Sequence, residues 1–474
     1  GNVYTTDGDA VLNLSGTKSY TDNSVAEGGQ GGNPIDQNKF TFELKAKGGY
    51  VTDGGSDQNL TINAADVPMP IGADGATMQQ GNVVNAFNFP NIEFGPACVG
   101  NTYVYEVAEV AGTEENMTYD KTVYTVKVEV TEATEGEGAE AHAHITATPT
   151  YSTPEGEATA IAFVNSYTPD AATLSGDTAI KGTKTMTGRD MLEDEGFTFQ
   201  LTPTGNTVAA INNGTVTGID TDGLTSTAAA GGDDGVAVDF NFDDITFAKV
   251  GVYTFTMSEN VPADENKAGG VTYDDHDCTV TVNVTLNKET GALEAAVDYG
   301  TNGEAAGNAF VNAYTASMSY GDAGSLTVAK TMQGRPMFAG EFEFTIAGTD
   351  TSTVSAADAS AKLSDNDKKF SNADYAEGAE WSVAKLSGLT FTQADAGKTY
   401  SYIVDEVLPA QQKPSLTYDQ NTYRVDIEVV DDLDGTMHTV TKVYRTANAE
   451  GEPAEPELLG TYNSAEDQAA KVSF

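Results

Sequence analysis

The chain has 474 residues, enough for about three domains of the usual size. Its net charge of −47, from 24 Lys and Arg against 71 Asp and Glu, argues against electrostatic binding of nucleic acid or anionic lipid. No apolar run is as long as a membrane span and no secretory signal opens the sequence, so we expect an intracellular protein or a processed ectodomain.

Alternating apolar and polar residues, bounded by Gly, Asn and Asp, recur along the chain, and amphipathic helical patterns are hard to find. A period of two is typical of strands that bury one face. The pattern therefore predicts an all-β fold.

Five segments mark the first part of the chain, and we expect strands in them, with the Thr-Tyr-Asp triplet in a turn. They are "LSGTKSY" (14–20), "FTFEL" (40–44), "NIEFGPACVGNTYVYEVAE" (91–109), "MTYDKTVYTVKVEV" (117–130) and "AFVNSYT" (162–168).

The same segments return twice in the same order. The second set is "IKGTKTM" (180–186), "FTFQL" (197–201), "DITFAKVGVYTFTMSE" (244–259), "VTYDDHDCTVTVNV" (271–284) and "AFVNAYT" (309–315). The third set is "VAKTM" (328–332), "FEFTI" (342–346), "GLTFTQADAGKTYSYIVDE" (388–406), "LTYDQNTYRVDIEV" (416–429) and "LGTYNSA" (459–465). Polar linkers near residues 170 and 318 predict three β-sandwich domains joined end to end, over 1–170, 171–318 and 319–474.

Each repeat places one Lys, one Glu and one Asn in phase with its inward apolar residues. The Lys is on the first strand, the Glu on a middle strand and the Asn on the last strand. These residues are Lys18, Glu109 and Asn165; Lys184, Glu259 and Asn312; and Lys330, Glu406 and Asn463. Lys181 is out of phase with Ile180, so Lys184 is the stronger candidate in the second repeat.

A single inward Lys has an ordinary explanation, because it can extend to the surface or pair with a buried acid. The same trio occurs on the same strands in all three repeats, which argues against an inward Lys that the fold merely tolerates. Desolvation lowers the pKa of a Lys and raises that of a Glu, so a buried pair can supply a nucleophilic amine and a carboxylic acid. With an Asn carboxamide as acyl donor, such a trio can form a Lys–Asn isopeptide bond without a His, metal or cofactor.

The strand Lys, the Glu-bearing strand, the "TYD" turn and the terminal "FVNxY" together resemble the isopeptide linkage repeats of Gram-positive backbone pilins and surface adhesin stalks. The resemblance implies the pairs Lys18–Asn165, Lys184–Asn312 and Lys330–Asn463, promoted by Glu109, Glu259 and Glu406. In the third repeat "TYNSA" replaces "FVNxY" at Asn463.

The resemblance further implies an extracellular structural protein of the cell wall or pilus, with other surface subunits as partners and no cofactor. Such a protein is not an enzyme, since each bond forms once. A bond between the first and last strands would carry tension through each domain.

An alternative function is a module that binds a host glycan or matrix protein. The insertions at 45–86, 203–236 and 349–385, the last of which includes the sole tryptophan, Trp381, would then form the binding site. An enzyme acting on an external substrate is a distant third possibility, because no phosphate loop or Ser/His/Asp arrangement is present.

The remaining candidates are weaker. Cys98 and Cys278 fall in different repeats, so we expect no disulfide within a domain. His142 and His144 share a strand face and could bind a metal, although an exposed edge is the simpler interpretation. Asp-rich loops at 220–223 and 365–368 lack the spacing of a calcium loop.

Overall fold

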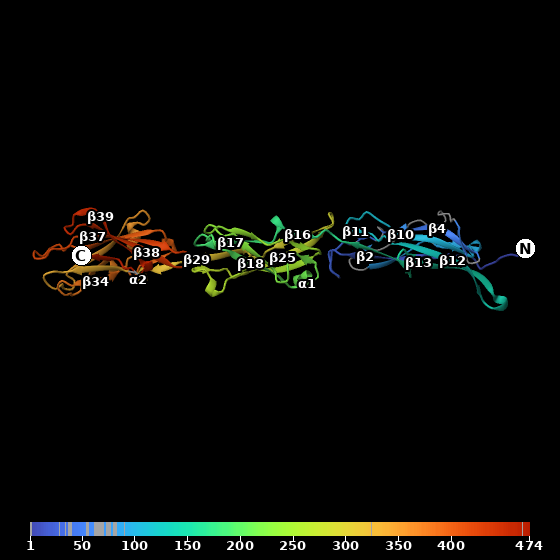
Figure 1. Cartoon of the computed structure of the whole chain (residues 1–474), viewed down its shortest axis with the longest axis horizontal. Helices are drawn as coiled ribbons and strands as arrows, with labels where there is room; N and C mark the ends of the chain where they lie inside the picture. The colour runs from blue at the N-terminus through green and yellow to red at the C-terminus, as the bar shows by residue number, and fades with distance from the viewer. Residues whose placement is uncertain are drawn as a thin grey trace.

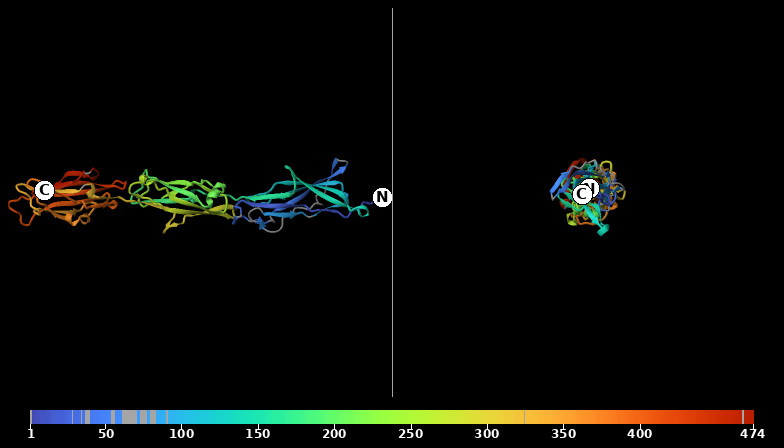
Figure 2. Two further views of the ribbon diagram at one scale, coloured as in Figure 1. Left: turned by 90° about the horizontal axis from the view of Figure 1, so that it is seen from below. Right: turned by 90° about the vertical axis from the view of Figure 1, so that its right-hand side faces the viewer.

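The structure is a computed structural model. It describes residues 2–27, 29–33, 35–36, 40–53, 56–60, 71–72, 77–78, 83–89, 91–323, 325–466 and 468–474. Three β-rich units follow one another along a single long axis, with the N-terminus at one end and the third unit at the other (Figure 1). Two further views show the same narrow rod from below and end-on (Figure 2). This confirms the predicted tandem all-β architecture.

The first unit has two main sheets that enclose its core. The larger sheet runs in the order β14 (Gly156–Ala158), β13 (His142–Thr153), β12 (Val123–Glu135), β10 (Asn101–Val110), β4 (Thr41–Asp53) and β5 (Ser56–Leu60), with β6 (Ile71–Gly72) also on β4. The smaller runs β11 (Met117–Thr118), β15 (Ile161–Tyr167), β2 (Ser15–Asp22) and β8 (Val83–Asn88). Two short pairs are β1 (Ala10–Leu12) with β9 (Ile92–Phe94) and β3 (Ile35–Asp36) with β7 (Thr77–Met78).

The second unit repeats this arrangement. Its larger sheet runs β20 (Leu224–Ala228), β18 (Phe197–Thr204), β23 (Gly251–Glu259), β25 (Asp277–Asn287) and β26 (Ala292–Asp298). The facing sheet runs β21 (Val238–Asn241), β17 (Lys181–Thr187), β29 (Ala309–Tyr314) and β24 (Val271–Thr272). The remaining elements are β16 (Ala172–Leu174), β22 (Ile245–Phe247) and β19 (Val216–Thr217) in one sheet, the pair β27 (Thr301–Asn302) and β28 (Ala305–Ala306), and helix α1 (Asn206–Asn212).

The third unit keeps the larger sheet and alters the smaller one. The larger runs β33 (Lys369–Ser371), β32 (Glu343–Thr349), β36 (Thr399–Val407), β37 (Thr422–Asp431), β38 (Met437–Ala447) and β39 (Pro453–Asn463). The smaller runs β34 (Glu380–Lys385), β31 (Leu326–Thr331) and β40 (Lys471–Ser473). The unit also contains the pair β30 (Ser317–Ser319) and β35 (Thr390–Thr392), and the helices α2 (Tyr320–Ala323), α3 (Ala356–Ala361) and α4 (Asp365–Lys368).

One topological feature is common to all three units: the first strand of the smaller sheet pairs in parallel with a strand from the end of the unit. These pairs are β2 with β15, β17 with β29 and β31 with β40. Since a parallel pair cannot be closed by a tight turn, the rest of the unit forms the connection between its two strands. A strand near the start of each unit therefore lies beside a strand near its end.

Contacts at the two junctions join neighbouring units. Val250 N–H donates to the Ser24 carbonyl at the first junction, over 2.8 Å. At the second, the Tyr314 hydroxyl donates to Asp431 Oδ1 over 2.6 Å. Within the described ranges, no helix is both long enough and apolar enough to span a membrane.

Candidate cross-linking sites

In the first unit, Lys18, Glu109 and Asn165 meet in the core between the two sheets. Lys18 Nζ lies 2.7 Å from Glu109 Oε2, and Asn165 Nδ2 donates to Glu109 Oε1 over 2.8 Å. Lys18 is on β2 and Asn165 on β15, where Lys18 is in register with Phe163 and Asn165 with Tyr20. One carboxyl group on β10 therefore contacts the amine and the carboxamide on two adjacent strands of the facing sheet.

The second unit reproduces this geometry. Lys184 Nζ lies 2.6 Å from Glu259 Oε2, and Asn312 Nδ2 donates to Glu259 Oε1 over 2.8 Å. Lys184 is on β17, opposite Phe310, and Asn312 lies on the adjacent β29, two residues farther along. Lys181, the alternative nucleophile, is exposed and donates to the Asp177 carbonyl instead. The structure thus brings together both of the first two predicted trios.

Burial sets the protonation chemistry of these trios. Lys18 is 1% exposed and Lys184 is fully buried. Desolvation lowers the pKa of both lysines, and burial raises the pKa of both Glu109 and Glu259. These opposite shifts lower the free-energy cost of moving the proton from the Lys amine to the Glu carboxyl.

The Asp of each "TYD" turn holds the Asn from the other side. Asp120 N–H donates to Asn165 Oδ1 over 2.8 Å, and Asp274 N–H donates to Asn312 Oδ1 over 2.7 Å. Because a backbone N–H can only donate, it orients each carboxamide with its oxygen toward the turn and its nitrogen toward the Glu. The backbone N–H of the turn, and not the Glu, therefore contacts the carboxamide oxygen.

The same Asp side chains also hold the strand that carries the Asn. Asp120 Oδ2 accepts from Val164 N–H, and Asp274 Oδ2 accepts from Val311 N–H, each over 2.8 Å. The residue before each Asn is thus attached to the turn that contacts its carboxamide. The turn Asp is part of the recurring Thr-Tyr-Asp motif, but the sequence alone does not predict its role. That role depends on contacts between segments that are far apart in the sequence.

The first Phe of each F-x-F segment covers the Lys. Lys18 Nζ lies 4.8 Å from the centre of the Phe40 ring, and Lys184 Nζ lies 4.7 Å from that of Phe197. Lys330 Nζ has the same relation to Phe342, at 4.6 Å. The first Phe of the segment therefore lies over the Lys amine in all three units.

The third unit contains the Lys and the Glu but does not bring Asn463 to them. Lys330 Nζ lies 2.6 Å from Glu406 Oε2, and burial raises the pKa of Glu406. Asn463 ends β39, opposite Val440, and its Oδ1 accepts from Ala465 N–H. β37 and β38 lie between β36, which carries Glu406, and β39, a separation of roughly 14 Å at the usual strand spacing. The predicted Lys330–Asn463 pairing is therefore corrected: "TYNSA" belongs to an added edge strand.

The strand that corresponds to β15 and β29 is instead β40, and Phe474 corresponds to Phe163. Tyr124 OH donates to the carbonyl of Ala162, and Tyr423 OH donates to that of Ser473, the residue before Phe474. The Phe163 and Phe474 rings pack at 89° against Tyr124 and Tyr423, respectively.

The family model for FctA, the Spy0128-like isopeptide-containing domain, matches the chain three times, over residues 14–168, 180–315 and 326–455. The matches span most of the sequence. The chain belongs to this family. This confirms the resemblance to pilin isopeptide repeats, and the third match ends before Asn463 and β40.

Similar solved structures were also found. The major pilin T3.2 of Streptococcus pyogenes aligns at 17% identity over 64% of this chain and 98% of its own, with a TM-score of 0.26. A second S. pyogenes major pilin aligns at 17% identity over 65% of this chain and 99% of its own, with a TM-score of 0.25. The Bacillus anthracis TIE protein aligns at 9% identity over 100% of this chain and 75% of its own, with a TM-score of 0.18. No curated protein matches the sequence.

Within the described residues of this member of the FctA family, the cysteines and histidines singled out in the sequence lie outside the two trios. Cys98 and Cys278 are free, and Cys278 is buried. His142 Nδ1 lies 3.1 Å from Asp7 Oδ2, and in the described part of the chain no group of three or more potential ligands could hold a metal.

The insertions offer little support for a ligand site. Trp381 is only 7% exposed and stacks on Phe344, with ring centres 5.9 Å apart. It therefore does not form the exposed aromatic surface that ligand recognition through 349–385 would use. Much of the 45–86 insertion lies outside the described residues.

Proposed function

We propose that this chain is a structural subunit of a Gram-positive surface fibre, either a pilus subunit or an adhesin stalk. Its first two domains are each closed by an autocatalytic Lys–Asn isopeptide bond. The observation that carries the proposal is the shared carboxyl group, whose two oxygens contact the Lys amine and the Asn nitrogen in both units. The three units, near 1–170, 171–318 and 319–474, act as successive load-bearing domains, with other wall or pilus subunits as partners.

The geometry supports a simple reaction path. The buried Glu takes a proton from the Lys, and the neutral amine attacks Cγ of the Asn carboxamide. The turn N–H that contacts Oδ1 stabilises the negative charge that develops on this oxygen. The Glu then delivers this proton to Nδ2 and accepts a second proton from the attacking nitrogen as the Cγ–Nδ2 bond breaks. Ammonia leaves and carries off the remaining proton as ammonium. The amine and carboxamide become one amide plus NH₃, and the Glu is regenerated.

Intact mass of the denatured protein tests this proposal. Each bond releases one ammonia, so we expect a mass about 34 Da below the sequence mass, from two bonds. Peptide mapping should place these bonds at Lys18–Asn165 and Lys184–Asn312. An unchanged mass would return both trios to ordinary buried ion pairs, and the structural role argued from covalent closure would fail with them.

Replacing the turn Asp should impair bond formation without preventing it. Asp274→Ala keeps the backbone N–H but removes the carboxylate that holds Val311 N–H, so Asn312 loses part of its positioning. We expect a mixture of masses about 34 and 17 Da below the sequence mass shortly after synthesis. Asp274→Asn keeps an oxygen acceptor and should restore most of the bond.

The matched control is Asp419→Ala, which alters the corresponding turn in the third unit. It should leave the mass deficit unchanged, because Asp419 does not contact either of the first two sites. Complete cross-linking in Asp274→Ala would show that the carboxylate does not position the Asn.

A further inference from the structure

His276 follows the Thr-Tyr-Asp turn of the second unit and joins that turn to the strand of the acyl donor. Its Nδ1 lies 2.6 Å from Asp274 Oδ1, and its Nε2 lies 2.8 Å from the carbonyl oxygen of Gly307. Gly307 lies two residues before β29, the strand that carries Asn312. The His276 ring also stacks on Phe310 of β29, with ring centres 4.5 Å apart.

The two partners of the His276 ring define its protonation. A backbone carbonyl can only accept, so Nε2 carries the proton that it donates to Gly307. Burial opposes ionisation of Asp274, but the hydrogen bonds from Val311 and His276 outweigh it and lower the pKa of this carboxyl. An ionised carboxylate can only accept as well, so Nδ1 also carries a proton. The ring in this geometry is therefore an imidazolium.

The surroundings of the ring favour its positive charge. Asp274 in the turn and Asp277 on β25 both attract it, whereas Phe310 and the Gly307 carbonyl face the ring without a formal charge. Burial opposes protonation, but the hydrogen bonds to Gly307 and Asp274 raise the pKa of His276. As the pH rises through this raised pKa, the ring loses one N–H, and a lone pair then faces an acceptor. The link between turn and strand is therefore complete at low pH and weakened at high pH.

In the first and third units a Tyr hydroxyl holds the corresponding strand. Tyr124 OH donates to the carbonyl of Ala162 on β15, and Tyr423 OH makes the equivalent contact on β40. Cys278 has the same position in the second unit, because all three residues lie opposite the residue two before the site Glu. The Cys278 thiol donates to the Tyr299 carbonyl, outside β29. The second unit therefore has no Tyr hydroxyl at this position to hold its Asn-bearing strand.

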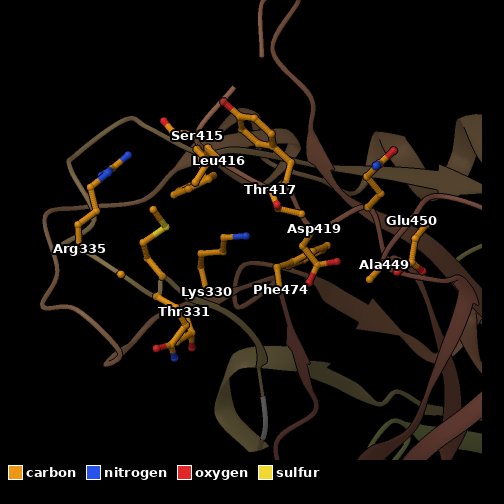
Figure 3. Close-up of a pocket in the computed structure, with 16 residues that line it drawn as sticks. Lys330, Thr331, Arg335, Ser415, Leu416, Thr417, Asp419, Ala449, Glu450 and Phe474 are labelled. Atoms are coloured by element: carbon orange, nitrogen blue, oxygen red, sulfur yellow. The ribbon is translucent and has the colours of Figure 1, made fainter. Parts of the chain in front are cut away.

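The residue two positions after the turn Asp also differs among the units. Thr122 donates its backbone N–H to the turn Asp of the first unit. In the third unit, Asn421 donates its N–H and Nδ2 to Asp419, which lies beside Phe474 (Figure 3). His276 makes the same backbone contact and adds a ring that reaches the segment before β29.

We propose that His276, as an imidazolium, is a positioning residue for the second cross-link and makes formation of this bond sensitive to pH. The inference rests on the proposed function of the second site. Through Asp274, the ring holds the turn whose N–H contacts Asn312 Oδ1. The charge of Asp274 also acts on Lys184 and Glu259, so the positive ring beside it limits the effect of this carboxylate on the reacting groups.

The test compares the two bonds within the same chain. The full chain is made by cell-free synthesis, transferred at once into buffers from about pH 6 to about pH 9, quenched in acid at intervals and digested. Mass spectrometry of the linked peptides gives the rate of the second bond relative to the first. We expect this ratio to fall on the order of tenfold as the pH rises through the pKa of His276, from the loss of one charge-assisted hydrogen bond. Ionisation of Lys and Glu acts on both sites and largely cancels in the ratio.

Substitutions separate positioning from a general effect on folding. His276→Thr, which introduces the residue of the first unit, should lower the ratio at about pH 6 to the high-pH value of the wild type and remove its pH dependence. Adding Cys278→Tyr completes the first unit's arrangement and should restore the ratio without restoring the pH dependence. The matched control is His438→Thr, which removes a His that contacts Asp432 in the third unit. It should change neither the ratio nor its pH profile.

Nitrogen-15 NMR of the His rings gives a readout that does not depend on bond formation. The chain has four His, and the signals of His276 are those that His276→Thr removes. Recorded in Glu259→Gln, whose second unit we expect to stay unlinked, they should show both ring nitrogens protonated at about pH 7. A neutral ring at that pH would overturn the inference.

The outcomes distinguish this inference from the proposal on which it rests. A ratio independent of pH in the wild type would overturn the role of His276, as would a second bond that keeps pace with the first in His276→Thr. Both bonds would still form in these cases, so the proposed function would stand. If neither bond forms in the wild type, the proposed function and this inference both fail.

Discussion

Glu259→Gln is expected to leave the second unit folded but without its covalent bond. Gln has nearly the shape of Glu, and its one amide oxygen can still accept a hydrogen bond from either Lys184 Nζ or Asn312 Nδ2. It cannot accept the amine proton or protonate the departing nitrogen, so the general acid–base step is lost. The intact mass should lie about 17 Da below the variant's own sequence mass, from the first unit alone.

In the same variant, the second unit should melt at a lower temperature than it does in the wild type. Closing a loop the length of Lys184 to Asn312 contributes about 5 kcal/mol by the chain-entropy model used for disulfides. For a unit of this size, the loss should lower the melting temperature by on the order of 10 °C or more. Calorimetry should then resolve a new transition below that of the first unit.

Two comparison variants make this result specific. Asn312→Ala removes the acceptor but keeps the Lys184–Glu259 pair, so it should show the same mass and a similar shift in melting. Glu294→Gln makes the same charge change at an exposed site in the same unit and should change neither. Wild-type melting in both unlinked variants would show that the bond does not stabilise the unit.

The inward direction of the Lys, Glu and Asn residues was predictable because strand alternation alone decides which face a side chain takes. Period two placed Lys18 among the apolar residues of its strand, and it is buried. The same alternation predicted that Glu109 and Asn165 point inward, and both residues are buried. The recurrence of the Lys, Glu and Asn trio in three repeats is what indicated isopeptide chemistry, since a single buried Lys has ordinary explanations.

The contacts that position the carboxamide could not be predicted from these patterns. The parallel pairing of β2 with β15 joins segments from opposite ends of a unit, and no local rule specifies it. The N–H of Asp120 meets Asn165 only because of that pairing. The ring of Phe40 over Lys18 likewise depends on how the two sheets pack.

The third acceptor was misassigned because a short motif was matched without its strand partner. "TYNSA" contains a Tyr and an Asn in the right part of the repeat, but β38 and β39 form a hairpin that carries Asn463 away from the site. The alternation of Ala470, Val472 and Phe474 marks the true terminal strand, and all three residues are buried. That signal was present in the sequence but lies after the motif.

Pulling the chain by its two ends should extend only the third unit. Lys18 is on β2, near the start of the first unit, and Asn165 is on its parallel neighbour β15, near the end of the unit. A bond between them transmits the load directly and excludes the residues between them from extension. A bond between Lys184 and Asn312 transmits the load through the second unit in the same way. In the third, the load is borne by the hydrogen bonds between β31 and β40, which can shear.

Force spectroscopy on wild type and Glu109→Gln would measure this difference. Wild type should show a single unfolding event, from the third unit. Glu109→Gln should add a second event that releases roughly 50 nm, the length of the segment between Lys18 and Asn165 at about 3.5 Å per extended residue. The third unit is the internal reference in every trace, because the substitution in the first unit leaves it unchanged. Two further releases in wild type, of the size expected for linked segments, would mean that the load bypasses the bonds. A second release confined to Glu109→Gln would instead identify the Lys18–Asn165 bond as the element that carries tension.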